Sequence, residues 1–274
     1  MPTTNITSGK RGTLAAMNLV RPESGRNKRS RVLPRLVVGI LGAVASVTGL
    51  SGCQAVTSTN TNVTQLRIID ATPDAGGIDI YAGNNVLTYN LGYGTITSYI
   101  PMNPGTYTLA ADTTGTKTAL SSVRASLLNG KQYTLLFSNV AASLQAQVLT
   151  DQSSPAPTGQ IALRFLDEAI YPGALDLYLV PTGSTLAKVN PVLTNINFNN
   201  TPTYINVPTG TYTLYVLSAG TVVSDTTVPL YTGASTTYPA GSARTFVMLD
   251  QQILTTPAVQ VVMTADYDSA TATQ

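Results

Sequence analysis

Two arginine–aspartate pairs with the same spacing are the first residues in this sequence that could do chemistry. Arg67 and Asp79 are 12 residues apart, and so are Arg164 and Asp176. A guanidinium beside a carboxylate could bind a polar ligand. It could also be a cross-strand ion pair that fixes strand register, worth about 0.2–1 kcal/mol. Because the pair recurs in two copies of one unit, we predict two structural ion pairs.

Cys53 is the only cysteine, and its surroundings are the most specific motif in the chain. A basic segment, Arg21 to Arg35, and a short apolar run, Leu36 to Val47, precede it. This order is typical of a secretory signal peptide, and the run is shorter than the roughly 20 residues of a membrane-spanning helix. Leu50-Ser51-Gly52-Cys53 resembles a bacterial lipobox. The resemblance implies cleavage between Gly52 and Cys53 and acylation of Cys53.

Acylation predicts both a partner and a location. Two or more acyl chains anchor a protein stably, so membrane lipid is the expected partner of Cys53. We expect a lipid-anchored protein of the cell envelope. Gln54 follows the cysteine, which by analogy with bacterial sorting indicates the outer membrane in a Gram-negative source, and otherwise the outer face of the plasma membrane. Either Met1 or Met17 is the start.

Charge and residue usage exclude several classes of function. Eight of the 15 basic residues but only Glu23 among the 13 acidic ones precede Cys53, which leaves 7 basic and 12 acidic residues after it. An acidic mature chain argues against nucleic-acid binding. The sequence has no histidine, hence no Ser-His or Cys-His pair and no histidine metal site. We predict a protein that is not an enzyme and has no cofactor.

A calcium site is the one metal hypothesis that the acids allow. Asp70, Asp74 and Asp79 lie close together in sequence, but the alternating acids of a calcium loop that ends in glutamate are missing. We therefore predict no metal site.

An internal repeat organises the chain after Cys53. Leu66 to Asp70 matches Leu163 to Asp167, and Ile78 to Tyr81 matches Leu175 to Tyr178 at the same offset of 97. Further blocks match in order, including Tyr99-Ile100 with Tyr204-Ile205 and Gly105 to Leu109 with Gly210 to Leu214. Each copy reads as short strands separated by Gly, Pro and Asn turns, which favours an antiparallel sandwich or barrel.

We predict an all-β protein with two tandem antiparallel β-sandwiches after a helical signal peptide; the family resemblance described below implies that they are immunoglobulin-like. The expected parts are a signal peptide (1–52), a flexible tether (53–63), sandwich 1 (64–151), a linker (152–159), sandwich 2 (160–266) and a disordered tail (267–274). The linker is rich in Pro and Ser, which favours an extended, uncommitted chain.

Both copies resemble the bacterial domain-of-unknown-function 4397 family. Arg67 through Tyr81, with Thr72-Pro73-Asp74, and Pro104 through Tyr107 carry the resemblance in copy one. Copy two keeps Arg164, Asp176, Tyr178 and Gly210-Thr211-Tyr212 but lacks the Thr-Pro-Asp segment. The resemblance implies an immunoglobulin-like sandwich at the cell surface or envelope, and it implies no activity.

Tyrosines supply the remaining candidate residues. Tyr107 and Tyr212 follow turns and resemble the tyrosine corner of immunoglobulin-like sandwiches, where the hydroxyl bonds back to the chain. Tyr81, Tyr89, Tyr93 and Tyr99 could form a face that stacks on sugars, or could simply pack on the sheets. Our leading hypothesis is a non-catalytic binding, adhesion or structural protein with an envelope protein or glycan as partner. The alternative is a carbohydrate-binding module protein.

Overall fold

The computed structural model describes residues 62–200, 203–251 and 259–268. Contacts between Cα atoms divide the chain into two units, Met1–Ala55 and Val56–Gln274, and every element described below belongs to the second. The predicted signal peptide, the lipidation site at Cys53 and most of the tether and tail lie outside the described residues. The described part is almost entirely β-structure, which confirms the predicted all-β class. Within it, no helix has the length and apolarity needed to cross a membrane.

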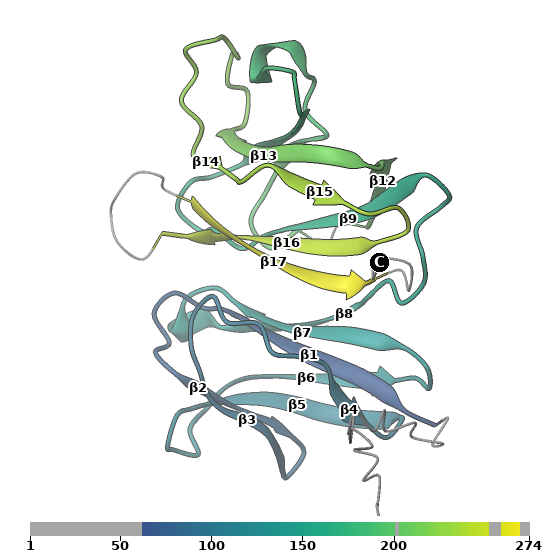
Figure 1. The fold of residues 1–274 in the computed structure, drawn as a ribbon. Coiled ribbons are helices and arrows are strands. Elements are labelled where there is room, and N and C mark those ends of the chain that lie inside the picture. The colour runs from purple at the N-terminus through teal and green to yellow at the C-terminus, as the bar shows by residue number, and fades with distance from the viewer. Residues whose placement is uncertain (1–61, 201–202, 252–258, 269–274) are drawn as a thin grey trace, which may run out of the picture. The chain divides into compact units, whose positions relative to one another are not determined.

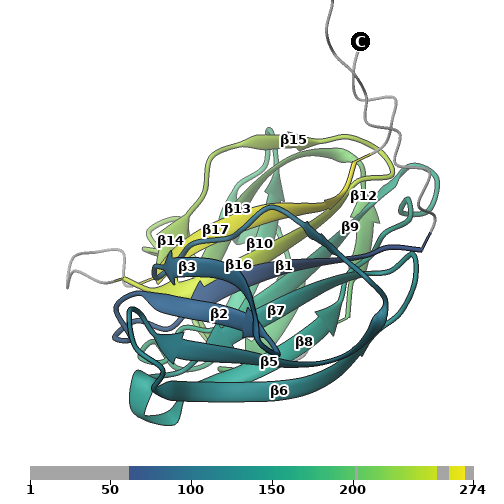
Figure 2. The ribbon, with the colours of Figure 1, turned by 90° about the horizontal axis from the view of Figure 1, so that it is seen from below.

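The first sandwich consists of two four-stranded sheets with strand orders β4-β1-β7-β8 and β3-β2-β5-β6. Figure 2 shows the second of these sheets nearest the viewer. The buried core between the sheets includes Leu66, Ile80 and Phe137. The elements are β1 (Thr64–Ala71), β2 (Ile78–Ala82), β3 (Asn85–Leu91), β4 (Ile100–Met102), β5 (Gly105–Thr113), β6 (Ala119–Leu127), β7 (Gln132–Ser138), the 3-10 helix η1 (Ala141–Ser143) and β8 (Gln145–Thr150).

The second sandwich repeats this arrangement. Its sheets have the orders β12-β9-β16-β17 and β11-β10-β13-β14, with β15 also paired to β13. Phe165 and Phe246 stack in its core with their ring centroids 5.0 Å apart. The elements are β9 (Gln160–Asp167), β10 (Leu175–Pro181), the 3-10 helix η2 (Leu186–Lys188), β11 (Leu193–Ile196), β12 (Ile205–Pro208), β13 (Gly210–Ser218), β14 (Tyr231–Thr232), β15 (Thr236–Tyr238), β16 (Ala243–Asp250) and β17 (Val259–Tyr267).

The two sheets that contain β1 and β9 are buried on both faces. Side chains alternate along a strand, so Leu66 and Ile68 of β1 enter the core of the first sandwich, whereas Ile69 and Ala71 face the second. In β9, Phe165 belongs to the second core and Leu166 to the shared cluster. Figure 1 shows the result, four sheets in layers with the β1 and β9 sheets in the middle.

The strand order within each sandwich differs from the expected immunoglobulin pattern. An immunoglobulin domain pairs its strands as ABED and CFG, so its first strand lies beside its second. Here β1 lies between β4 and β7, and the β1–β7 pair is parallel. The β9–β16 pair is parallel as well. The sandwich architecture is as predicted, but each inner sheet is mixed, because β1 and β9 pair with a strand that runs in the same direction.

The segment between the sandwiches is docked on the protein. The backbone N–H of Ala156 donates to the carbonyl of Gly241 at 3.0 Å, and Ala156 is buried. The N–H of Gln152 donates to the hydroxyl of Tyr204. The expectation of an uncommitted linker is therefore wrong, because its backbone groups have partners in the second sandwich.

Candidate functional site

Two buried arginines cross the boundary between the sandwiches and exchange partners. Arg67, from β1, donates to Asp266 at the end of the second sandwich. Arg164, from β9, donates to Asp151 at the end of the first, with 2.6 Å between Nη2 and Oδ1. Arg67 also lies 3.4 Å from Asp151. The arginine side chains are 1% and 3% exposed and both aspartate side chains 0%, so all four charges are removed from water.

The predicted pairs Arg67–Asp79 and Arg164–Asp176 are therefore wrong. Ile78 and Ile80 enter the core, so Asp79 between them points to the outer face of its sheet. Arg67 points the other way, toward the second sandwich, and the core of the first sandwich separates the two side chains. The equal spacing of 12 reflects the repeated strand positions, and it does not reflect contact.

The two predicted aspartates have structural partners of their own. Asp79 accepts hydrogen bonds from the N–H of Asn90 at 2.8 Å and of Gly115 at 3.1 Å. These backbone donors hold the pKa of Asp79 below its usual value. Asp176 accepts in the same way from the N–H of Asn195 at 2.8 Å and of Gly220 at 2.9 Å. Each carboxylate thus ties the neighbouring strand, β3 or β11, and a turn glycine to its own strand.

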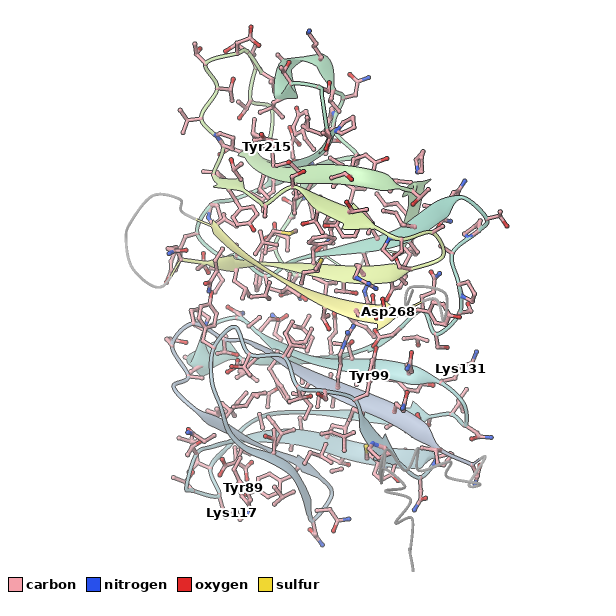
Figure 3. All side chains as sticks on the ribbon, viewed as in Figure 1. Tyr89, Tyr99, Lys117, Lys131, Tyr215 and Asp268 are labelled. Atoms are coloured by element: carbon pink, nitrogen blue, oxygen red, sulfur yellow. The ribbon has the colours of Figure 1, made fainter. Side chains whose placement is uncertain are left out.

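A threonine and a tyrosine complete the buried site in each copy. In the first, Nε of Arg67 donates to Thr134 at 2.8 Å, Thr134 lies 2.7 Å from an oxygen of Asp151, and the hydroxyl of Tyr99 donates to Asp151 at 2.7 Å. The Arg67 guanidinium carbon lies 5.0 Å from the centre of the Tyr99 ring. Figure 3 shows Tyr99 at the boundary between the sandwiches.

The second copy repeats these contacts nearly atom for atom. Arg164 donates to Thr245 at 3.0 Å, and Thr245 and Tyr204 donate to Asp266 at 2.7 and 2.8 Å. The Arg164 guanidinium carbon lies 4.8 Å from the centre of the Tyr204 ring. When a residue of one unit contacts a residue of the other, and the equivalent residues make the same contact in the reverse direction, the interface has two-fold symmetry. We call these eight residues the ion cluster: Arg67, Tyr99, Thr134, Asp151, Arg164, Tyr204, Thr245 and Asp266.

Burial and neighbouring charge act in opposite directions on the ion cluster. Burial lowers the pKa of Arg67, but the carboxylates of Asp151 and Asp266 outweigh it, and the pKa is raised. Burial raises the pKa of Tyr99 and of Tyr204 well above the usual value. Arg67 therefore stays charged, and Tyr99 and Tyr204 stay protonated as donors. Buried charges are tolerated when they are paired and hydrogen-bonded, as they are here.

An apolar cluster lies beside the ion cluster in the same interface. Ile69 and Leu136 come from the first sandwich, and Leu166, Val247 and Leu249 come from the second. All five are 0% exposed. The interface thus joins apolar burial to paired charges, which together specify one arrangement of the two sandwiches.

The tyrosine-corner residues make the hydrogen bond that this motif requires. The hydroxyl of Tyr107 donates to the carbonyl of Asn103 at 2.8 Å, and that of Tyr212 donates to Pro208 at 3.0 Å. In both copies the acceptor lies four residues upstream. The role is structural, since each bond fixes the turn before β5 or β13.

The four tyrosines considered as a sugar-stacking face do not share one surface. Tyr99 belongs to the ion cluster, and Tyr93 donates to the carbonyl of Asp250 in the second sandwich at 2.7 Å. Tyr81 is 7% exposed and lies under Lys117, whose Nζ is 3.9 Å from the ring centre. Tyr89 is 65% exposed, and Figure 3 shows it close to Lys117.

The three acids of the calcium hypothesis also separate. Asp70 accepts from the N–H of Thr72, and Asp74 from the N–H of Ala141. Asp79 accepts from Asn90 and Gly115, as described above. Among the described residues, no group of three or more acidic, histidine or cysteine side chains could hold a metal ion.

Sequence reasoning missed Thr134, Asp151 and their counterparts in the second copy. Tyr99 and Tyr204 were detectable, because the repeat aligns them. Asp151 and Asp266 stand at the ends of the last strand of each copy, where the repeat blocks no longer align without a shift. Each arginine lies in a strand that is otherwise apolar and therefore buried. Because a buried charge needs a partner, this pattern predicts that an acidic residue from another part of the chain faces the arginine.

Comparison with known proteins gives weak similarity to solved structures and one family match. A structure titled as alpha-glucan binding by a streptococcal virulence factor is 12% identical with a TM-score of 0.22, and the match covers 56% of this chain and 80% of that chain. Family 41 carbohydrate-binding modules from streptococcal virulence factors are 10% identical with a TM-score of 0.21, and the match covers 61% and 84%.

A third solved structure is similarly distant. A family 26 carbohydrate-binding module from Eubacterium rectale, in complex with maltoheptaose, is 11% identical with a TM-score of 0.20, and the match covers 76% of this chain and 98% of that chain. No curated protein matches the sequence. The model of the family described as "Domain of unknown function (DUF4397)" matches residues 64–178, the whole first sandwich together with β9 and part of β10.

Proposed function

We propose that this chain is a lipid-anchored, non-catalytic protein of the bacterial cell envelope, whose two sandwiches act as one binding or structural unit. The ion cluster is the observation that supports the single unit, and the sequence around Cys53 supports the anchor. Buried charges that are fully paired across an interface stabilise one arrangement, because separating them leaves unpaired charges. The same strand order and the same Arg, Thr, Asp and Tyr set support placing the second sandwich in the DUF4397 family with the first.

The loops opposite the point of chain entry are the proposed contact surface. The chain enters at Thr64 and reaches the other end of β1 after about 25 Å. Because β1 and β7 are parallel, the loops that follow both strands lie at that end. The N–H of Gly94 donates to the carbonyl of Asp70 there, and Tyr93 joins it to Asp250 at the end of β16. Loops of both sandwiches thus share one end, and we propose that they meet an envelope protein or glycan.

The anchor is tested by mass spectrometry and fractionation of the full chain. We expect the mature protein to begin at Cys53 and to carry the mass of the attached acyl chains, and to stay with membranes after a high-salt wash. Cys53→Ala should release it or leave it unprocessed. A mature wild-type protein with an unmodified Cys53 still joined to Gly52 would refute the anchor.

Carbohydrate binding is the second candidate, and Tyr89 favours it. This tyrosine is exposed on β3, and Val86 of the same strand lines a cleft of about 500 Å³ with Met102 and Asn103. An exposed aromatic ring on a strand that also borders a cleft suits a small ligand.

On a glycan array, Tyr89→Ala should lose at least tenfold in signal if this surface binds sugar. Tyr171→Ala, which removes another exposed tyrosine at 77% exposure, is the matched control and should bind as the wild type does. Equal signals for all three proteins would exclude Tyr89 as a sugar-stacking residue.

A further inference from the structure

The two-fold match between the sandwiches fails at one buried position. Ala71 ends β1 and pairs in register with Ser138 of β7. In the second sandwich the corresponding residues are Glu168, directly after β9, and Leu249 of β16. The apolar Ala71 thus corresponds to a glutamate, and the hydroxyl of Ser138 to a leucine. Glu168 therefore adds a carboxyl group to the interface, whereas the equivalent place, formed by Ala71 and Leu249, is apolar.

Glu168 lies in the interface without a firm hydrogen-bond partner. Arg164 and Leu166 point toward the first sandwich, and alternation along the strand directs Glu168 to the same side. The residue is 0% exposed. Neither carboxyl oxygen has a hydrogen bond of good geometry, and Ser138 of the first sandwich is the hydroxyl close enough to favour the ionised form. A buried carboxylate so poorly paired is strongly unfavourable.

We propose that Glu168 is a proton-controlled latch between the two sandwiches, which closes this end of the interface when its carboxyl is protonated and opens it when the proton is lost. The ion cluster holds the other end through charges that are already paired. Loss of one proton therefore loosens the loop end alone. The loop end is the surface that faces away from the point of chain entry, so the latch would control the relative position of its loops.

Burial and the carboxylate of Asp167 act on Glu168 in the same direction, and together they outweigh the hydroxyl of Ser138. Burial raises the pKa of Glu168 to about 8, and the carboxylate of Asp167 adds to the rise. Asp167 itself has a pKa raised to about 7 by burial and by Asp250, and Asp70 at the end of β1 has one raised to about 6 by burial. Tyr93, which touches Asp250, stays protonated because burial raises its pKa. Asp167 and Asp70 gain negative charge as pH rises, and each proton that they lose weakens the closed state.

The titration of Glu168 can be observed directly, because Glu23 and Glu168 are the two glutamates of the sequence. Mature protein in detergent, labelled with 13C at glutamate, gives one carboxyl resonance by NMR, because the proposed cleavage after Gly52 removes Glu23. We expect this resonance to titrate near pH 8, well above the ordinary value of about 4.3. A resonance that titrates between pH 4 and 5 would overturn the proposal, and this measurement needs no variant.

Opening is measured by hydrogen–deuterium exchange of β1, β7 and β9, expressed as protection relative to the free peptide at each pH. If Glu168 has an ordinary pKa in the open state, opening becomes more favourable as pH rises. Protection should then fall by up to about tenfold per pH unit between pH 5 and 8, and the fall should level off above pH 8. Glu168→Gln should remove its share of this loss. Asp268→Asn, which neutralises an exposed carboxylate, should leave the profile unchanged. Matching profiles for wild type and Glu168→Gln would refute the latch.

Discussion

Replacing Asp266 by alanine should lower the free energy of unfolding by about 3–5 kcal/mol, the usual effect of breaking a buried ion pair from one side. The substitution leaves Arg67 buried with only the more distant carboxylate of Asp151 nearby. It also removes the carboxylate that accepts hydrogen bonds from Tyr204 and Thr245. For a protein of this size the melting temperature should fall by roughly 10 °C. Thermal and urea unfolding, followed by circular dichroism, measure both quantities.

Asp268 provides a matched control two residues further along. It pairs with Arg244, but its side chain is 57% exposed, and exposed pairs contribute about 0–1 kcal/mol. Asp268→Ala should therefore change stability little. Asp151→Ala should resemble Asp266→Ala, because the two acids correspond in the repeat. A destabilisation by Asp266→Ala no larger than that by Asp268→Ala would mean that the ion cluster does not hold the sandwiches together.

The protein should be most stable in mildly acidic solution and should lose stability steadily as pH rises to 8. Burial raises the pKa of Asp70 to about 6 and of Asp167 to about 7, from an ordinary 3.8. The folded state therefore keeps protons that the unfolded state has released. Stability from these groups is complete below about pH 4 and is lost as pH rises through 6 and 7, by up to about 1.4 kcal/mol per group and pH unit.

On the acid side the sign reverses. The backbone hydrogen bonds to Asp79 lower its pKa, so its contribution is present above its unfolded pKa of about 4 and is lost as pH falls. We expect a maximum in melting temperature near pH 4–5.

Differential scanning calorimetry from pH 3 to 9 measures the profile. Asp167→Asn should flatten it between pH 5 and 7, because the neutral amide has no proton to lose, whereas Asp74→Asn, at an exposed position, should not. A melting temperature that rises from pH 5 to 8 would contradict the prediction.

The sequence allowed the class of fold to be predicted, because its signals are local. Alternation and turn residues located most strands, and the repeat showed that two units follow one another. Strand order was not accessible in this way. Nothing in Thr64–Ala71 specifies that it lies beside Gln132–Ser138 in parallel, since that choice depends on packing across 67 residues of chain.

The partners of the arginines could not be predicted for a related reason. Spacing places Arg67 and Asp79 in successive strands, but β1 and β2 belong to different sheets, and their side chains leave the sandwich on opposite sides. A better signal was available in the composition of β1 and β9. Apolar residues at both odd and even positions indicate a strand buried on both faces. An arginine there must meet an acid from a third layer, which here is the other sandwich.

The length of chain between Arg67 and Asp266 determines when the ion cluster can form during folding. The two residues are 199 positions apart, and contacts between distant residues form slowly because a large loop must first be closed. The arginine belongs to the first strand, and its carboxylate partner belongs to the last. We therefore expect the chain to remain an open intermediate until its last strand is in place, and the ion cluster to form as the last step of assembly.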